Sequence, residues 1–478
     1  MFAQINEWIK IIDQWVWGLP LIILILVTGI FLTCRLGLLQ MRHLPRALRY
    51  MFKNESEGEG EVSSFGALCT ALSATIGTGN IAGVATALVA GGPGALLWMW
   101  IAAFFGMATK YAEGLLAVYY RTVDKDGHAL GGPFYYIERG MGRKWRWLGC
   151  MFAFFGMCVG LFGIGTFTQV NSIATAVSNL FDPNGENTVA MFGRDYSYAT
   201  IIAGVLLTIA VALVIIGGIK RIASVSQVIV PFMAVLYIIF CAAVLIYNYK
   251  SIPSAFAQII EGAFNPAAIT GGAIGSMTVA MQKGIARGIF SNESGLGSAP
   301  IAAAAAQTKE PVRQGLVSMT GTFIDTIVIC TMTGLTIVIT GAWNIGLDGA
   351  VVTSYAFDHG LPFLPGWITS AVLMLCLVFF AFTTILGWDY YGERCLEYLS
   401  GGNKRSVMTY RWIYIAAVFI GPYMTIEAVW NIADIFNGLM ALPNLIALLA
   451  LNGVIVKETR SYFNRLSKGQ IQEYAPKK

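Results

Sequence analysis

Long apolar segments recur along this chain, and their length admits few kinds of structure. Each can cross about 30 Å of hydrocarbon as a helix, and the chain is 56% hydrophobic and only 12% charged. A soluble domain carries about 25% charged residues, so lipid is the expected solvent. Lipid leaves backbone groups without partners except in helices and closed barrels. We therefore predict an all-α integral membrane protein with eleven transmembrane helices, near residues 17–35, 64–90, 94–120, 147–180, 198–218, 225–249, 266–288, 315–341, 366–388, 411–425 and 432–456.

The basic residues predict an orientation, because Lys and Arg collect in cytoplasmic loops. With the N-terminus outside, the inner side holds all 31 Lys and Arg residues except Lys10, Arg194 and Lys250. The inner segments in this arrangement are 35–53, 110–146, 219–222, 283–313, 394–411 and 457–478. We expect a multi-pass protein of the plasma (inner) membrane with a cytoplasmic C-terminus, whose tail, 457–478, is solvated.

Two apolar segments are interrupted by glycine and polar residues. The second segment contains Ser73, Thr75, Gly77, Thr78, Gly79, Asn80 and Gly83, and the seventh contains Thr270, Gly271, Gly272, Gly275, Ser276 and Thr278. Glycine weakens a helix, and the polar groups need partners that lipid lacks. Close helix packing is the alternative for Gly77 and Gly79 taken alone. The neighbouring hydroxyls and Asn80 favour a broken helix that lines a cavity.

The two interruptions occupy corresponding places in two halves of the chain. Each begins a set of five spans, 64–249 and 266–456, and the two sets enter the membrane from opposite sides. This pattern predicts a 5+5 inverted repeat with one extra N-terminal helix, and such paired interruptions mark the site of a secondary transporter. The predicted units are residues 1–62, 63–250, 251–456 and 457–478.

The chemistry of a helix break follows from its geometry. The free N–H groups and positive dipole end of the second half suit a carboxylate. The released carbonyls and nearby hydroxyls suit a hard cation such as sodium, which prefers oxygen ligands. In a medium of low dielectric the two charges stabilise each other, which is a physical basis for coupled binding.

Three further polar or aromatic residues lie inside the spans, and each has two readings. Gln169 can bind substrate, with Thr166 and Phe167 nearby, or another helix. Trp388 can cap a small side chain or lie at the cytoplasmic interface. An intramembrane carboxylate is costly, so Asp325 is a possible coupling acid; structural pairing with Lys283 or Arg287 is the favoured reading.

Two inner segments carry further residues of note. Lys110 and Glu113 are three residues apart on one predicted helix and are expected to form a lateral pair. The small residues from Asn292 to Pro300 fit either a gate or a tightly packed hairpin.

Several motifs resemble those of the alanine/glycine:cation symporter family, and the resemblance covers essentially the whole chain. The matching stretches are Gly77–Gly83 (GTGNIAG), Gly91–Gly94 (GGPG), Lys110–Glu113 (KYAE), Gly131–Tyr136 (GGPFYY), Phe290–Pro300 (FSNESGLGSAP) and Asp325–Thr326. The stretch around Asn292 is the most specific, and Ser294 departs from the expected alanine. The family resembles the inverted-repeat fold of the bacterial leucine transporter with one extra N-terminal helix.

The resemblance also implies site residues. Main-chain amides of Thr78 and Gly79 are expected to bind the substrate carboxylate, and the same pocket is expected to include Gln169, Phe167, Gly275 and Trp388. Sodium is expected to bind the carbonyls of Ser73 and Ile76 and the hydroxyls of Thr383 and Thr384. A second cation site would use Thr75 and Asn80.

The interrupted helices predict a secondary transporter that works by alternating access, and the resemblance implies that it imports alanine, glycine or both with sodium. Proton coupling and a non-transporting amino-acid sensor are the alternatives. The chain has no GxSxG elbow, no P-loop and only three histidines, none with a carboxylate at catalytic-motif spacing. We therefore expect no enzyme activity, no cofactor beyond sodium as coupling ion, and no nucleic-acid partner. Lipid surrounds the chain, and either a monomer or a homo-oligomer fits the sequence.

Overall fold

The computed structural model describes residues 2–53, 58–125, 127–191, 194–264, 275–423 and 427–471. Most of them are helical. The elements of the first half are α1 (Phe2–Val16), α2 (Leu19–Arg35), α3 (Leu39–Phe52), α4 (Ser64–Thr75), η1 (Thr78–Asn80), α5 (Ala82–Gly91), α6 (Ala95–Tyr119), α7 (Pro133–Tyr136), η2 (Ile137–Met141), η3 (Arg143–Trp145), α8 (Arg146–Phe162), α9 (Phe167–Phe181), α10 (Tyr198–Ile215), α11 (Gly218–Tyr247), η4 (Tyr249–Ser251) and α12 (Ile252–Phe264). Those of the second half are α14 (Gly275–Asn292), α15 (Ala299–Ala303), α16 (Pro311–Thr322), η5 (Phe323–Cys330), α17 (Thr331–Ile339), η6 (Ala342–Asn344), α18 (Ala350–Gly360), α19 (Gly366–Leu399), α20 (Lys404–Ile420), η7 (Gly421–Tyr423), α21 (Glu427–Ala450) and α22 (Asn452–Ser467).

Two small antiparallel hairpins interrupt the helical pattern. In the first, β1 (Thr122–Val123) pairs with β2 (Ala129–Leu130). In the second, β3 (Thr188–Met191) pairs with β4 (Arg194–Ser197), and Thr188 lies opposite Ser197. Both hairpins lie in connections between predicted spans, and the described chain is otherwise mostly helical, as the all-α prediction expects.

The outer helices present apolar faces that only lipid would cover. On α10, Ile202, Leu206, Ile209 and Leu213 are exposed at spacings of three and four residues, which places them on one side of the helix. So large an exposed apolar stripe is unusual on a soluble monomer. This is a multi-pass membrane protein.

Within the described residues, seven helical stretches are long and apolar enough to span a membrane, and two bent helix pairs also qualify. The stretches are Glu7–Arg35, Ala95–Tyr119, Arg143–Phe181, Tyr198–Ile215, Gly218–Tyr247, Pro311–Ile339 and Gly366–Leu399, and the pairs are Ser64–Thr75 with Thr78–Gly91 and Asp434–Ala450 with Asn452–Ser467. The predicted count of eleven and the inverted repeat stay predictions.

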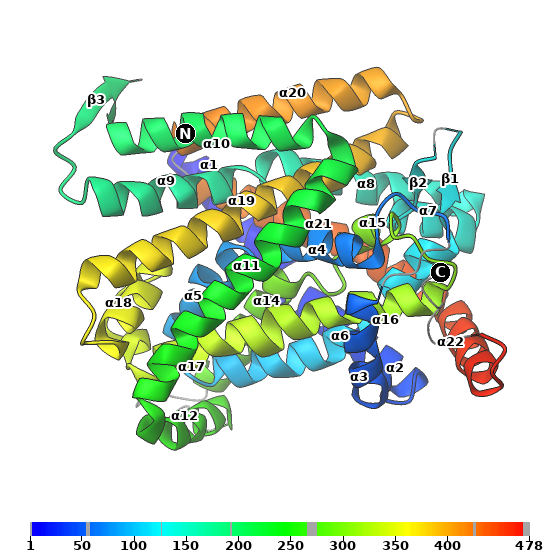
Figure 1. Cartoon of the computed structure of the whole chain (residues 1–478), viewed down its shortest axis with the longest axis horizontal. Coiled ribbons are helices and arrows are strands. Elements are labelled where there is room, and N and C mark those ends of the chain that lie inside the picture. Colours follow the sequence, from blue (N-terminus) through cyan, green and yellow to red (C-terminus); the bar gives the residue numbers. More distant parts are fainter. Residues whose placement is uncertain are drawn as a thin grey trace.

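The connections gather at two opposite ends of the molecule (Figure 1). One end holds β3, α12 and α18, and the other holds β1, β2, α7 and α22. These two groups correspond to the loops predicted to lie outside and inside, although which end faces the cytoplasm stays a prediction.

The predicted break in the second apolar segment is present. Helix α4 ends at Thr75, η1 begins at Thr78, and the axis bends by 61° between the two halves. Helix α4 packs against α11 and α19, whereas α5 packs against α14 and α18. The break therefore lies where the two halves of the helix meet different neighbours.

A further break divides the segment 147–180, which the sequence analysis treats as one helix. Helix α8 ends at Phe162 and α9 begins at Phe167. Thr166 Oγ1 donates a hydrogen bond of 2.7 Å to the Leu161 carbonyl, which satisfies one of the carbonyls freed by the break. Gly165 allows close approach of α19, because a Cβ at this position would lie 2.6 Å from Trp388 Cβ.

The predicted second broken helix lies mostly outside the described residues. Helix α14 begins at Gly275, and residues 265–274 before it are not described. The second bent pair in the described part of the chain is α21 with α22, at 58°.

The prediction of a solvated tail is wrong for its helical part, because α22 packs on the bundle. Thr459 and Tyr462 are buried. Tyr462 shares a hydrogen bond of 2.9 Å with Tyr50, and Thr459 shares one of 2.7 Å with Tyr111. Arg465 Nη2 lies 2.8 Å from Glu310 Oε2.

The segment from Asn292 to Pro300 is a tightly packed turn, every residue of which is buried. The Lys110 ammonium donates to the Asn292 carbonyl at 2.8 Å. Glu113 Oε1 accepts from the Gly295 N–H at 3.1 Å and from Asn444 Nδ2 at 2.6 Å. The predicted lateral pair of Lys110 and Glu113 is therefore wrong, since each side chain binds this turn instead.

Candidate substrate and cation site

The break between α4 and η1 leaves backbone groups free. In a continued helix the Gly77 N–H would bind the Ser73 carbonyl; here it donates to Asn80 Oδ1 at 2.9 Å. The N–H groups of Thr78 and Gly79 have no hydrogen-bond acceptor among the described residues. The carbonyl of Ser73 is thus released on one side of the break, and two amides are available on the other.

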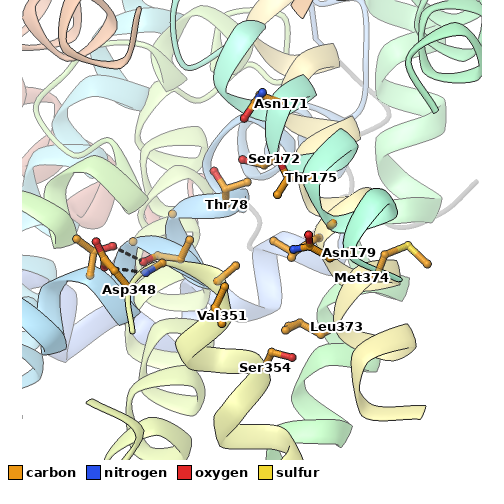
Figure 2. Close-up of a pocket in the computed structure, with 18 of the residues that line it drawn as sticks. Thr78, Asn171, Ser172, Thr175, Asn179, Asp348, Val351, Ser354, Leu373 and Met374 are labelled. Atoms are coloured by element: carbon orange, nitrogen blue, oxygen red, sulfur yellow. Dashed lines mark hydrogen bonds between the residues drawn. The ribbon is translucent and has the colours of Figure 1, made fainter. Parts of the chain in front are cut away.

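A cavity of about 740 Å³ adjoins the break. We call it the vestibule, and it is bounded by Thr78 and Gly79 at the break, Thr175 and Asn179 of α9, Arg287 of α14, and Asp348 before α18. Figure 2 shows Thr78 on one side of this space, with side chains of α9, α18 and α19 around it. The free amides of Thr78 and Gly79 are therefore on residues that a ligand in the vestibule would meet.

A polar stripe on α9 forms one wall of the vestibule. Asn171, Ser172, Thr175 and Asn179 all line it, and their spacing places them on one face of the helix. The sequence analysis missed this stripe, although Asn171, Thr175 and Asn179 follow one another at four-residue intervals. Helical spacing of polar residues in an otherwise apolar segment was the available signal.

Some of the predicted sodium ligands meet at the contact between α4 and α19. Thr384 Oγ1 donates to the Phe380 carbonyl of its own helix at 2.9 Å, and the same oxygen lies 3.5 Å from the Ile76 carbonyl of the broken helix. Ser73 Oγ lies 2.8 Å from where a Cβ on Gly387 would be, so the two helices touch closely there. Oxygen atoms of both helices are thus available to a hard cation.

Thr383 is buried beside Thr384 but binds elsewhere in this conformation. Its hydroxyl donates to the Phe379 carbonyl at 3.0 Å and lies 3.5 Å from Met233 Sδ of α11. The structure therefore brings Ser73, Ile76 and Thr384 together more directly than Thr383.

Gln169 reaches the break from the start of α9. A Cβ on Gly77 would lie 3.6 Å from Gln169 Oε1 and 2.6 Å from Thr384 Oγ1, so glycine is needed between these two side chains. Gln169 is 2% exposed, and its Oε1 has no hydrogen-bond partner among the described residues. A buried polar atom without a hydrogen-bond partner lowers the free energy of unfolding by about 1–3 kcal/mol. This cost favours a role in which Gln169 binds a ligand over a purely structural role.

Two other predicted pocket residues, Phe167 and Trp388, are not among the described residues that line the vestibule. Phe167 is buried, 3.5 Å from where a Cβ on Gly421 would lie. Trp388 is fully buried, with its ring centroid 5.4 Å from that of Tyr391, so the interfacial reading is wrong. Gly275 begins α14, directly after the segment that is not described.

Asp325 lies in η5, a stretch of wider π-helical turns between α16 and α17. Its Oδ1 accepts from Asn80 Nδ2 at 2.7 Å, and its Oδ2 accepts from Ser291 at 2.9 Å and Thr326 at 2.7 Å. No ion pair joins Asp325 to Lys283 or Arg287 in the described structure, so that prediction is wrong. Such π-helical turns frequently occur at functional sites.

The two residues predicted for a second cation site make different contacts. The Thr75 hydroxyl donates to carbonyls of its own helix, Ala71 at 3.2 Å and Leu72 at 3.3 Å. Asn80 uses its oxygen for Gly77 and its amide nitrogen for Asp325. In this conformation Asn80 holds the break in place.

Comparison with known proteins shows which family the chain belongs to. A family model described as the Sodium:alanine symporter family matches residues 2–476. The chain belongs to this family. A relative named Sodium/alanine symporter AgcS, from Methanococcus maripaludis, is 49% identical over 472 residues, which cover 97% of this chain and 98% of AgcS. An uncharacterized transporter of Haemophilus influenzae is 56% identical over 464 residues, 97% of each chain.

A solved structure has the same fold. The crystal structure of MhsT in complex with L-phenylalanine aligns with a TM-score of 0.55, at 13% sequence identity, and covers 85% of this chain and 99% of MhsT. The likeness at this identity concerns the fold alone.

Proposed function

We propose that this member of the sodium:alanine symporter family imports alanine, and also glycine, together with sodium. The observation that carries the proposal is the juxtaposition at the α4–η1 break. Free amides of Thr78 and Gly79 are on residues that line the vestibule, and oxygen atoms of Ile76 and Thr384 lie directly behind them. One break thus offers an anion site and a cation site within the same bundle.

The substrate carboxylate binds the amides of Thr78 and Gly79 in this proposal. These N–H groups begin the second half-helix, where the dipole favours negative charge. The unpartnered oxygen of Gln169 supplies an acceptor for the substrate ammonium group. Phe167, Trp388 and Gly275 would close the pocket around a small side chain, after a rearrangement that brings the two aromatic rings to the ligand.

Sodium binds the carbonyls of Ser73 and Ile76 and the hydroxyls of Thr383 and Thr384. Its charge and that of the substrate carboxylate stabilise each other in a medium of low dielectric, so each ligand favours the other. Thr75 and Asn80 would form a second cation site only if Asn80 exchanged its present partners. Each inward positive charge gains about 2.3 kcal/mol per 100 mV of membrane potential, which is sufficient to drive accumulation of a neutral substrate.

Transport follows alternating access around the fixed site. The two predicted five-helix repeats move relative to each other and expose the site first to the outside and then to the cytoplasm. The vestibule lies towards the end of the molecule that carries α18, whose connections are predicted to be extracellular. The N-terminus would then be outside and the C-terminus inside, in the plasma membrane.

The test is uptake of labelled alanine by the purified protein in liposomes. We expect uptake under an inward sodium gradient, competition by unlabelled glycine, and little competition by leucine. Uptake driven by a proton gradient alone would replace sodium as the coupling ion. Alanine binding without uptake under any gradient would favour an amino-acid sensor.

A further inference from the structure

Arg287 is a cation in the wall of the vestibule. It lies in the middle of α14 and is partly buried. The sequence analysis counts it with the inner segment 283–313, whereas the structure places it beside the cavity that reaches Thr78 and Asp348. The side of the membrane that Arg287 faces stays a prediction.

The guanidinium of Arg287 has no ion-pair partner in the described part of the chain. Its carbon lies 5.4 Å from the ring centroid of Phe290, at the distance of a cation–π contact. The carboxylates of Asp13 and Asp434 act on it electrostatically from α1 and α21, but neither forms a salt bridge with it. An arginine at membrane depth is costly unless it faces water, a carboxylate or a ligand. The vestibule is where such a partner can reach it.

The arginine and the break give the vestibule one region of positive potential. Thr78, Gly79 and Arg287 line the same cavity, so free backbone amides, a helix N-terminus and a guanidinium all favour a carboxylate there. Across the cavity, the α9 stripe offers amide and hydroxyl oxygens from Asn171, Ser172, Thr175 and Asn179. These oxygens can accept hydrogen bonds from an ammonium group.

The cavity extends from the break to Arg287 and α9. Its volume of about 740 Å³ falls within the range of about 300–1,000 Å³ that holds drug-sized ligands, so it is large enough for an amino acid beside Arg287. Of the residues proposed for the inner site, Gln169 and Thr384 do not line the vestibule, whereas Thr78 and Gly79 lie at its boundary with the inner site.

We propose that Arg287 and the α9 stripe form an outer subsite that captures zwitterionic amino acids by their carboxylate before they move to the break. The inference rests on the proposed function and adds a second binding position on the same route. Bidentate binding by guanidinium suits a carboxylate, and the oxygens of α9 suit the ammonium end. A ligand with only one of these charges would be captured less well.

The test is the rate of alanine binding to the full-length purified protein in sodium, followed with labelled alanine by scintillation proximity. Arg287→Gln should lower the association rate constant about tenfold, because the guanidinium that captures the carboxylate is removed, while the dissociation rate constant stays within about twofold. Arg287→Lys should recover part of the rate.

Lys283→Gln is the matched control, because Lys283 is a cation one turn earlier on the same helix that does not line the vestibule. It should associate at the wild-type rate. Equal association rates for the wild type and Arg287→Gln would overturn the outer subsite and leave the proposed function intact. A faster dissociation with unchanged association would also overturn it, since that pattern indicates a role at the inner site. Absence of alanine binding by the wild type would overturn the proposed function and the subsite together.

Discussion

Asn80 links the broken helix to Asp325 through its side-chain amide. Its Nδ2 donates to Asp325 Oδ1 at 2.7 Å, and its Oδ1 accepts the Gly77 N–H at 2.9 Å. Both residues are fully buried. One side chain therefore replaces the missing helical hydrogen bond of Gly77 and satisfies a carboxylate on a distant part of the chain.

Replacing Asn80 with Ala should destabilise the protein and impair uptake. The substitution leaves the Gly77 N–H and one Asp325 oxygen without partners, at about 1–3 kcal/mol each. We expect a lower midpoint of thermal unfolding in detergent and weaker sodium-dependent alanine uptake. Asn171→Ala is the control, because Asn171 lines the vestibule and is only partly buried. Equal midpoints for the two variants would contradict the bridging role of Asn80.

The glycines near the break should differ in their tolerance of a methyl group. A Cβ on Gly77 would lie 2.6 Å from Thr384 Oγ1, whereas a Cβ on Gly83 meets no atom within 4 Å. Gly77→Ala should therefore displace Thr384 and abolish most sodium-dependent uptake, while Gly83→Ala keeps it. Initial uptake rates in liposomes at matched protein incorporation test this pair. Similar activity in both variants would show that the Gly77–Thr384 contact is not needed.

Removing the hydroxyl of Thr384 should weaken sodium binding. Thr384→Val retains the side-chain shape but removes one oxygen ligand. A polar contact to a charged group contributes about 1.5–3 kcal/mol, so the sodium concentration for half-maximal uptake should rise roughly 10- to 150-fold. Thr384→Ser should restore most of the affinity.

The control for this variant is Thr28→Val. Thr28 is also fully buried, and its hydroxyl donates at 2.7 Å to the Leu24 carbonyl of its own helix, α2. In the sequence it lies well before the break between α4 and η1. Its sodium dependence should match that of the wild type. An unchanged sodium dependence in Thr384→Val would remove Thr384 from the cation site.

The first break was predictable because its signal is local. Glycine, hydroxyl and amide residues are adjacent in the sequence from Ser73 to Gly83, and each weakens or replaces helical hydrogen bonds. The break before Phe167 was missed, although Gly163 and Gly165 mark it. The apolar residues before Gly163 and after Gly165 together are long enough for one span. The length of an apolar segment does not show whether its helix is broken.

The contacts of Asp325 and Arg287 could not be predicted from one sequence. The partners of Asp325 come from η1 and α14, so they depend on tertiary packing. Arg287 was grouped with inner basic residues because its depth within the membrane depends on where α14 begins. The packed helix α22 carried a signal, since Ile455, Thr459 and Tyr462 follow helical spacing and are buried, but the many charges around them favoured a solvated tail.

The buried oxygen of Gln169 should lower the stability of the substrate-free protein and should also bind the substrate. A substitution that removes this oxygen should therefore change stability and substrate binding in opposite directions. Its Oε1 is buried and has no hydrogen-bond partner in the described structure. Gln169→Met keeps a similar shape and removes the unpartnered oxygen, so the substrate-free protein should unfold at a higher temperature, with a gain of about 1 kcal/mol. The same variant should raise the KM for alanine, since the substrate ammonium group loses its acceptor. Thermal unfolding without alanine and uptake kinetics measure the two effects. A loss of stability together with an unchanged KM would show that Gln169 binds the protein rather than the substrate.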